Sequence, residues 1–304
     1  MTVLVTGATG NIGRMVVDHL LARGATDVRA LTVDPERAAL PDGVEAVRGS
    51  LRRPDSLPAA FAGVQSLYLA PTPDTVEDVM ALARESGVRH VVDLSGEPES
   101  WWGSVSGAVE ASGPAWTHLW PADFVENVRT WLPQIRASGA VREPWPDGAS
   151  TPTAMDDIAE VAAVALLAER SSRSEHGPER SSRSEHGPGR SSRSEHGPGR
   201  HAGRAYPLTG PEPVSRRQMV RALSEATGRP IEFVRATPEE TVQALRPSMG
   251  GTAEWYVGNV LPYLAEHEPA PNRLVEDITG RPGTTFAAWA HAHADELRAA
   301  LDHG

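Results

Sequence analysis

The chain has 304 residues, of which 39% are hydrophobic, so it is long enough for one large α/β unit and a smaller appended region. Its 40 acidic residues against 29 basic ones give a formal charge of -11, which disfavours a nucleic-acid partner because such a partner requires a basic face. Cysteine is absent, and all 29 basic residues are arginine. Disulfides, thiol nucleophiles and any mechanism that depends on a lysine are therefore excluded.

No segment has the pattern of a membrane span or of a secretory signal. The longest apolar stretch lies within residues 158–168, is interrupted by Glu160 and is too short to cross a bilayer. The chain starts directly with a strand and a turn, without the basic and apolar regions of a signal peptide. We therefore expect a soluble, cytoplasmic protein without a membrane partner.

The N-terminal half alternates short apolar runs with helical patterns. The apolar runs lie at 3–6, 28–31, 45–47, 67–70, 90–94 and 116–119. Helical spacing of apolar residues falls between them, at 12–20, 56–61, 75–86 and 104–112. This alternation predicts an α/β fold with a Rossmann-type, doubly wound parallel sheet covered on both faces. We assign residues 1–170 to an NAD(P)-binding domain of this kind.

The C-terminal part has a different pattern. Helical patterns cover 156–168, 219–227, 238–245, 252–264 and 285–301. Ser215 and Gln218 have the spacing of a capping box before the second of these helices, and Gly228 ends that helix. These features predict a smaller, helix-rich substrate-binding region at 201–304.

Residues 171–200 separate the two regions and contain three copies of Ser-Ser-Arg-Ser-Glu-His-Gly-Pro at a ten-residue period. The repeat has no apolar residue that could stack on its neighbour, so it predicts a disordered insertion rather than a solenoid. His176, His186 and His196 could in principle gather a metal ion, but solvated loop histidines are the expected state. We predict no metal site.

A glycine-rich turn carries the clearest functional signal. Residues 6–13 read Thr-Gly-Ala-Thr-Gly-Asn-Ile-Gly and lie between the first strand and the first helix, which is the context of a dinucleotide fingerprint. Gly7 permits the tight turn, Gly10 lets the backbone approach a pyrophosphate, and Gly13 lets the helix pack on the strand. The helix N-terminus then offers N–H groups to the phosphates. The candidate cofactor-binding residues are Gly7, Thr9, Gly10, Asn11, Ile12 and Gly13, together with Thr32, Ala70 and Pro71 at the ends of later strands.

The Thr-Gly-x-x-Gly-x-x-Gly spacing resembles that of atypical short-chain dehydrogenases. Further stretches along the chain resemble the NmrA-like, NAD(P)-binding family within that group. These are VRALTVDPERA at 28–38, GVRHVVDLS at 87–95, SGPAWTHLWPADFVEN at 112–127, MDDIAEV at 155–161, GRAYPLTGPEP at 203–213 and TGRPGTTF at 279–286. The resemblance implies a nicotinamide cofactor, NADP(H) or NAD(H), with a slight preference for NADP(H).

Two departures from the family pattern affect the cofactor assignment. Family members that bind NADPH usually carry a basic residue just past the second strand, where this chain has Val33. Asp34 comes late for a contact with the 2′-hydroxyl of NAD, whereas Arg29 or Arg37 could replace the missing base. The second departure is Gly49-Ser50-Leu51, where the family usually has an aspartate near the adenine.

A third departure concerns catalysis. The short-chain dehydrogenase pattern implies a tyrosine with a lysine four residues later, and a chain without lysine cannot form this pair. Asp123 follows the sixth strand and is our first candidate for the proton source, although it could instead cap a helix starting near Phe124. Ser95 ends the fifth strand and is the candidate for orienting the substrate.

Other polar and aromatic residues near these strand ends are weaker candidates for catalysis or substrate binding. Glu97 and Glu99 are alternative acids, and solvated loop carboxylates are their expected state. We interpret His118, inside the sixth strand, as a core histidine. Trp101, Trp102 and Trp120 could line an aromatic pocket or simply belong to the core.

Three functions fit these observations. The first is an NAD(P)-dependent oxidoreductase without the Tyr-Lys pair, acting on a small organic molecule, aromatic compounds included. The second is a non-redox enzyme on the same fold, such as a cyclase, isomerase or dehydratase. The third is a non-catalytic regulator that senses NAD(P). We favour the first because the resemblance implies it. The expected partner is a small-molecule substrate, and the oligomeric state is left open.

Overall fold

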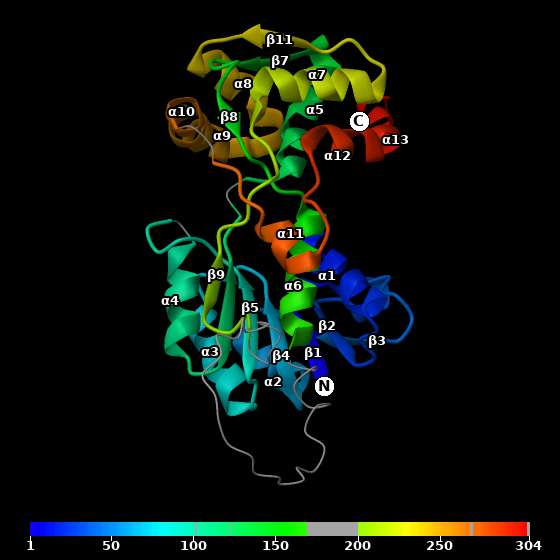
Figure 1. The fold of residues 1–304 in the computed structure, drawn as a ribbon, viewed down its shortest axis with the longest axis vertical. Coiled ribbons are helices and arrows are strands. Elements are labelled where there is room, and N and C mark those ends of the chain that lie inside the picture. The colour runs from blue at the N-terminus through cyan, green and yellow to red at the C-terminus, as the bar shows by residue number, and fades with distance from the viewer. Residues whose placement is uncertain (101, 122, 169–199, 268–269, 303–304) are drawn as a thin grey trace, which may run out of the picture. The chain divides into compact units, whose positions relative to one another are not determined.

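The computed structural model describes residues 1–100, 102–121, 123–168, 200–267 and 270–302 (Figure 1). Nearly all of the insertion predicted at 171–200 lies outside these residues. The chain divides into two compact units, one made of Met1–Trp120 and Ala159–Tyr206, the other of Pro121–Ile158 and Pro207–Gly304. This division differs from the sequence-based one, because residues 121–158 supply strands and helices to the second unit and residues 204–206 add a strand to the first.

Seven strands form one sheet in the first unit. They are β1 (Thr2–Val5), β2 (Val28–Thr32), β3 (Val44–Arg48), β4 (Val64–Leu69), β5 (His90–Leu94), β6 (Ala115–Leu119) and β9 (Arg204–Tyr206). Their order is β3-β2-β1-β4-β5-β6-β9, and each pair of neighbours is parallel. From β1 the chain adds β2 and β3 on one side of the sheet, and it then adds β4 and the later strands on the other side. Sheets of this kind bind ligands at the carboxyl ends of the strands where this change of side occurs, which is between β1 and β4 here. The Rossmann-type sheet is confirmed, and its seventh strand was not predicted.

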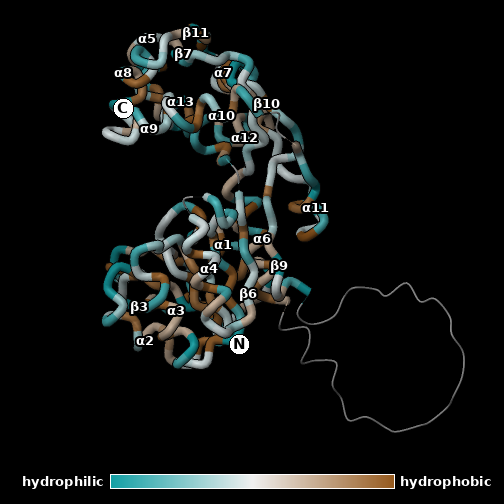
Figure 2. The backbone as a smooth tube through the Cα atoms, turned by 90° about the vertical axis from the view of Figure 1, so that its left-hand side faces the viewer, coloured by the Kyte–Doolittle hydropathy of each residue, from teal (hydrophilic) through white to brown (hydrophobic). Residues whose placement is uncertain are grey.

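Both faces of this sheet are covered. Leu4 and Val5 are neighbours on β1, so their side chains point to opposite faces, and both are fully buried. Leu4 belongs to an apolar cluster that includes residues of α2 (Pro58–Phe61), α3 (Val76–Glu85) and α4 (Gly103–Ala111). The other face of β1 and β2 packs against α1 (Asn11–Ala22). Figure 2 shows hydrophobic positions among the strands and helices and hydrophilic ones at the outer turns near β3.

The remaining helices of the first unit are short, apart from α6. The short ones are the 3-10 turns η1 (Pro35–Arg37) and η2 (Pro54–Ser56). The helix predicted at 156–168 is α6 (Met155–Leu167), which is buried over most of its length. Among the described residues, no helix combines the length and apolar content needed to cross a membrane.

The second unit is rich in helices, as predicted. Its helical elements are η3 (Val125–Trp131), α5 (Leu132–Ser138), α7 (Arg216–Thr227), α8 (Pro238–Met249), η5 (Gly250–Thr252), α9 (Ala253–Trp255), η6 (Tyr256–Val260), α10 (Leu261–Glu266), α11 (Leu274–Thr279), α12 (Phe286–Ala292) and α13 (Ala294–Asp302). The capping box of Ser215 and Gln218 is present at the start of α7. The single helix predicted at 285–301 is instead broken at His293, whose φ of -104° and ψ of 15° leave the helical region.

Two small sheets of the second unit were not predicted. In one, β7 (Ala140–Glu143) pairs in parallel with β11 (Glu232–Arg235). In the other, β8 (Ala149–Ser150) pairs antiparallel with β10 (Val214–Ser215). These strands have four or two residues each, so they are too short to show a clear alternation of apolar and polar residues.

Candidate functional site

The turn between β1 and α1 has the backbone geometry that its glycines predict. Gly7 has a φ of +61°, a left-handed conformation that glycine adopts without strain. A Cβ atom on Gly13 would lie 2.2 Å from the carbonyl oxygen of Gly7, so only glycine lets α1 pack this closely on the turn. A Cβ atom on Gly10 would lie 3.2 Å from the same oxygen. The turn therefore fits the close approach of a pyrophosphate to the backbone.

The N-terminus of α1 is accessible at this turn. Gly10 is its N-cap residue, and the helix begins at Asn11. Thr9, Gly10 and Asn11 are exposed, whereas the side chain of Ile12 is buried. The first N–H groups of a helix have no partner within the helix and lie at its positive end, so they suit an anion. The backbone of this segment can hold a diphosphate, and the side chain of Ile12 anchors it to the core.

The ends of β2 and β4 complete this edge of the sheet. The N–H of Ala70 donates to Thr6 Oγ1 at 2.8 Å, and the same hydroxyl donates to the carbonyl oxygen of Tyr68 at 2.9 Å. Thr6 therefore joins the ends of β1 and β4, a role that the sequence did not reveal. Thr32 is buried at the end of β2, and Pro71 is exposed after β4. Because β2, β1 and β4 are neighbours, the predicted cofactor residues share one edge, and their role in binding stays a prediction.

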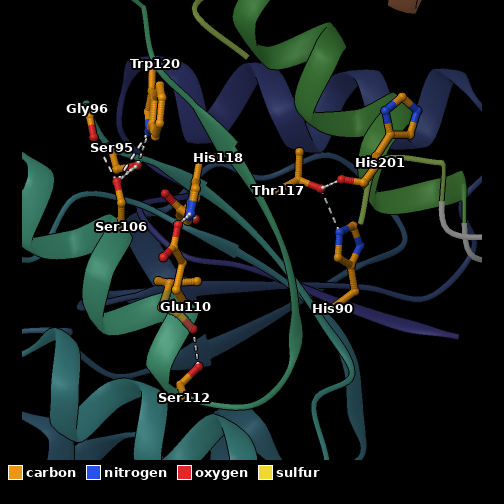
Figure 3. Close-up of polar contacts among 12 residues, drawn as sticks. His90, Ser95, Gly96, Ser106, Glu110, Ser112, Thr117, His118, Trp120 and His201 are labelled. Atoms are coloured by element: carbon orange, nitrogen blue, oxygen red, sulfur yellow. Dashed lines mark hydrogen bonds and ion pairs between the residues drawn. The ribbon is translucent and has the colours of Figure 1, made fainter. Parts of the chain in front are cut away.

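Ser95 lies directly after β5 in a buried, hydrogen-bonded group (Figure 3). Its Oγ accepts a hydrogen bond from Trp120 Nε1 at 3.1 Å and lies 3.0 Å from Ser106 Oγ. Ser106 also donates to the carbonyl oxygen of Gly96 at 2.8 Å. These contacts fix the start of the loop after β5. The Ser95 hydroxyl is thus held in one place, which is what an orienting group requires.

His118 lies inside the first unit on β6 and is paired on both sides of its ring (Figure 3). Its Nδ1 is 2.6 Å from Asp93 Oδ2, and its Nε2 is 3.3 Å from Glu110 Oε1. The ring stacks on Trp116 with a centroid distance of 4.1 Å and on Trp120 with one of 5.8 Å. His118 and Asp93 are both fully buried. The interpretation of His118 as a core histidine is confirmed.

Asp123 belongs to the second unit, so it and Ser95 lie in different units. Its Oδ1 accepts hydrogen bonds from the N–H of Phe124 at 2.9 Å and from Asn127 Nδ2 at 2.7 Å. Its Oδ2 accepts one from Ser150 Oγ at 2.9 Å. The N-cap residue of η3 is Phe124 rather than Asp123. Asp123 therefore orders its own loop through Asn127 and Ser150, and it is not a simple helix cap.

The remaining candidates from the sequence are mostly on the surface. Glu97 and Glu99 are exposed, as expected for loop carboxylates. Trp102 is 40% exposed, and Trp101 lies outside the described residues. Within the described part of the chain, no group of three or more acidic or histidine side chains could hold a metal ion.

The second unit contains a buried charged cluster that the sequence did not reveal. Arg216 Nε lies 3.3 Å from Glu143 Oε2, and both side chains are buried. Trp131 Nε1 donates to Glu143 Oε1 at 2.7 Å, and Arg216 donates to the Tyr256 hydroxyl at 2.6 Å. Burial raises the pKa of Glu143, and burial raises the pKa of Tyr256 to about 12, with Asp123 adding to both shifts. The four residues come from separate elements, so no local pattern could have found them.

Comparison with known proteins agrees with this geometry. A family model described as NAD(P)H-binding matches residues 7–98. The chain is 33% identical to an NAD(P)H azoreductase of Xenophilus azovorans, over 98% of this chain and 100% of that protein. It resembles the structure of a Citrobacter triphenylmethane reductase complexed with NADP(H), with 22% identity, a TM-score of 0.74 and coverage of 97% and 100% of the two chains. It also resembles NmrA, a negative transcriptional regulator, in complex with NADP, with 16% identity, a TM-score of 0.67 and coverage of 99% and 98%.

The fold and the glycine turn thus define a Rossmann-type protein with an NAD(P)-binding domain. The chain belongs to the same NAD(P)-binding family as this azoreductase, as its 33% identity over nearly the whole of both chains shows. Its similarity to NmrA shows that the two proteins share a fold.

Proposed function

We propose that this protein is an NAD(P)-dependent reductase of small organic molecules, aromatic compounds included, without a Tyr-Lys pair. The observation that carries the proposal is the turn of Gly7, Gly10 and Gly13 at the carboxyl end of β1, beside β4, where the strand order changes side. The chain that contains this turn is 33% identical to an azoreductase over nearly its whole length. When bound, the nicotinamide cofactor supplies a hydride. NADP(H) is the proposed form, and a small molecule is the proposed partner, with neither nucleic acid nor a membrane.

The chain's own residues would bind the cofactor and manage the proton. The N-terminus of α1 and the Gly10 backbone would hold the diphosphate. Ser95, fixed by Trp120, would orient the substrate through its hydroxyl. Asp123 is the proposed proton source, and Glu97 and Glu99 come next if Asp123 only orders its loop. A chain with no lysine must deliver the proton in some way other than through the usual pair.

The proposal can be tested by following the absorbance of NADPH or NADH with methyl red as the azo substrate. We expect cofactor oxidation that depends on both the protein and the dye. If a cofactor binds but no compound from a panel of azo dyes, quinones and aldehydes is reduced, the protein is better described as a regulator that senses NAD(P). If neither cofactor binds to the folded protein, a non-redox activity takes precedence.

A further inference from the structure

A pocket of about 680 Å³ opens beside the ends of β2 and β3, and three of its lining residues are arginines. Arg48 is the last residue of β3, and Arg52 and Arg53 lie in the loop that follows it. Val33, directly after β2, lines the same pocket and is 61% exposed. The pocket therefore places three basic side chains beside the position that lacks the base usual in NADPH-binding relatives.

Hydrogen bonds hold the arginine-bearing loop in place. The N–H of Gly49 donates to the carbonyl oxygen of Thr32 at 2.9 Å, which ties the loop to the end of β2. The N–H of Arg53 donates to the carbonyl oxygen of Ser50 at 2.9 Å, and Ser56 Oγ donates to that of Arg53 at 2.7 Å. The backbone of the loop is therefore ordered before any ligand binds, so only the arginine side chains lose conformational freedom on binding.

The charges of this pocket suit an anion. Three arginines and a single carboxylate, that of Asp55, line the pocket, so its lining is basic although the formal charge of the whole chain is -11. Arg48 donates to the carbonyl oxygen of Val33 at 2.9 Å, and among the described residues no carboxylate forms an ion pair with Arg48, Arg52 or Arg53. Unpaired guanidinium groups form strong, bidentate hydrogen bonds with phosphate.

The position in the fold identifies the anion. In Rossmann sheets the adenosine ribose lies at the end of the second strand, where an acidic residue contacts its 2′-hydroxyl or a nearby arginine accommodates a 2′-phosphate. Val33 can do neither. We propose that Arg52 and Arg53, with Arg48 beside them, form the 2′-phosphate site and make the protein prefer NADP(H) to NAD(H). This inference rests on the proposed function, because it requires a dinucleotide at the glycine turn.

The test is calorimetric titration of the full chain with NADPH and with NADH, and with 2′,5′-ADP and 5′-AMP as fragments that differ in the 2′-phosphate. We expect the wild type to bind NADPH and 2′,5′-ADP at least about tenfold more tightly than their counterparts, as charge-assisted hydrogen bonds predict. The double variant R52A/R53A should lose that preference while its Kd for NADH changes less than about twofold. Arg89→Ala is the matched control. Arg89 is also exposed, but it directly precedes β5 and so lies at the amino ends of the parallel strands, whereas the pocket lies at their carboxyl ends.

The outcomes separate the two claims. Binding of NADPH and NADH with equal affinity overturns the arginine site and the preference for NADP(H), and equal weakening of both in R52A/R53A overturns the arginine site. Either result leaves the proposed NAD(P)-dependent reductase activity standing. Absence of binding by all four compounds to folded wild-type protein overturns both. Thermal melting of each variant shows whether the protein is folded.

Discussion

His118 Nδ1 lies 2.6 Å from Asp93 Oδ2, on adjacent strands of the sheet, and neither side chain is accessible to solvent. The two residues are paired across β5 and β6, so the sheet itself fixes their separation. Asp93 Oδ1 has no hydrogen-bond partner among the residues that the structure describes. A buried polar pair of this kind depends on both members, because the loss of one leaves the other unpaired in an apolar interior.

We therefore expect Asp93→Ala to lower the free energy of unfolding by about 3 kcal/mol, the usual cost of breaking a buried pair. Glu110 contacts the other ring nitrogen of His118 but is 50% exposed. Glu110→Ala should therefore cost less than about 1 kcal/mol. Urea unfolding of the two variants measures the difference. Equal losses would mean that the buried contact with Asp93 has no special importance.

Gly13→Ala should weaken both folding and cofactor binding. The added Cβ would lie 2.2 Å from the carbonyl oxygen of Gly7, so α1 must move away from the turn. We expect a loss of at least about 2 kcal/mol in the free energy of unfolding, as for other steric overpacking. The control is Gly107→Ala on the exposed face of α4, where a Cβ meets no atom within 4 Å. That variant should gain about 0.5–1 kcal/mol, because alanine favours a helix over glycine. A stable Gly13→Ala protein with normal binding would contradict the packing described above.

The sequence predicted the elements that depend on local patterns. Strands β1 to β6, the glycine turn and the cap at Ser215 each have a signal within about ten residues. Arg216 and Glu143 instead form a contact although they are 73 residues apart in the sequence, and the residues next to each of them contain no pattern that predicts this contact. The arginine pocket was missed for a similar reason. The basic residues near Val33 in the sequence are Arg29 and Arg37, whereas the fold brings Arg52 and Arg53 beside Val33 from the loop after β3. The break at His293 was missed because apolar spacing continues through it.

His201 makes folding sensitive to acid. Burial, with Arg200, His90 and Arg204 nearby, lowers the pKa of His201 to about 4. Its Nε2 accepts a hydrogen bond from Arg200 at 2.8 Å, and its Nδ1 lies 2.8 Å from the Tyr206 hydroxyl, so the neutral ring fits this environment. Between pH 6.5 and 4 the unfolded chain binds a proton here that the folded chain does not. The stability from His201 is therefore complete above pH 6.5 and is lost as the pH falls toward 4.

The variant His201→Gln isolates this contribution. Glutamine can accept from Arg200 and donate to Tyr206, but it does not titrate. Urea midpoints from pH 7 to pH 4.5 should fall less steeply for the variant than for the wild type. Burial raises the pKa of Glu126, Glu143 and Asp157, which acts in the opposite direction, but these groups are common to both proteins. Parallel pH profiles would rule out His201 as the titrating group.

Asp123→Asn tests the proposed proton source. Asparagine keeps an oxygen to accept from Phe124 and Asn127, and its amide can donate to Ser150, so the loop should remain ordered. If Asp123 supplies the proton, kcat should fall about 100-fold or more with little change in the Kd for the cofactor. Full turnover would show that Asp123 only orders its loop, and Glu97→Gln and Glu99→Gln would then be examined in the same assay.

The central claim is that the glycine turn binds a nicotinamide dinucleotide. Calorimetric titration of wild-type protein and of Gly10→Leu with NADPH, NADH, NADP⁺ and NAD⁺ tests it most directly. Gly10 has an extended backbone that leucine can adopt, but the added side chain would stand where the pyrophosphate approaches. We predict saturable binding of at least one form by the wild type and a Kd at least about 100-fold higher for Gly10→Leu, at a similar melting temperature. No binding of any form by the folded wild type, or unchanged binding by Gly10→Leu, would contradict the claim.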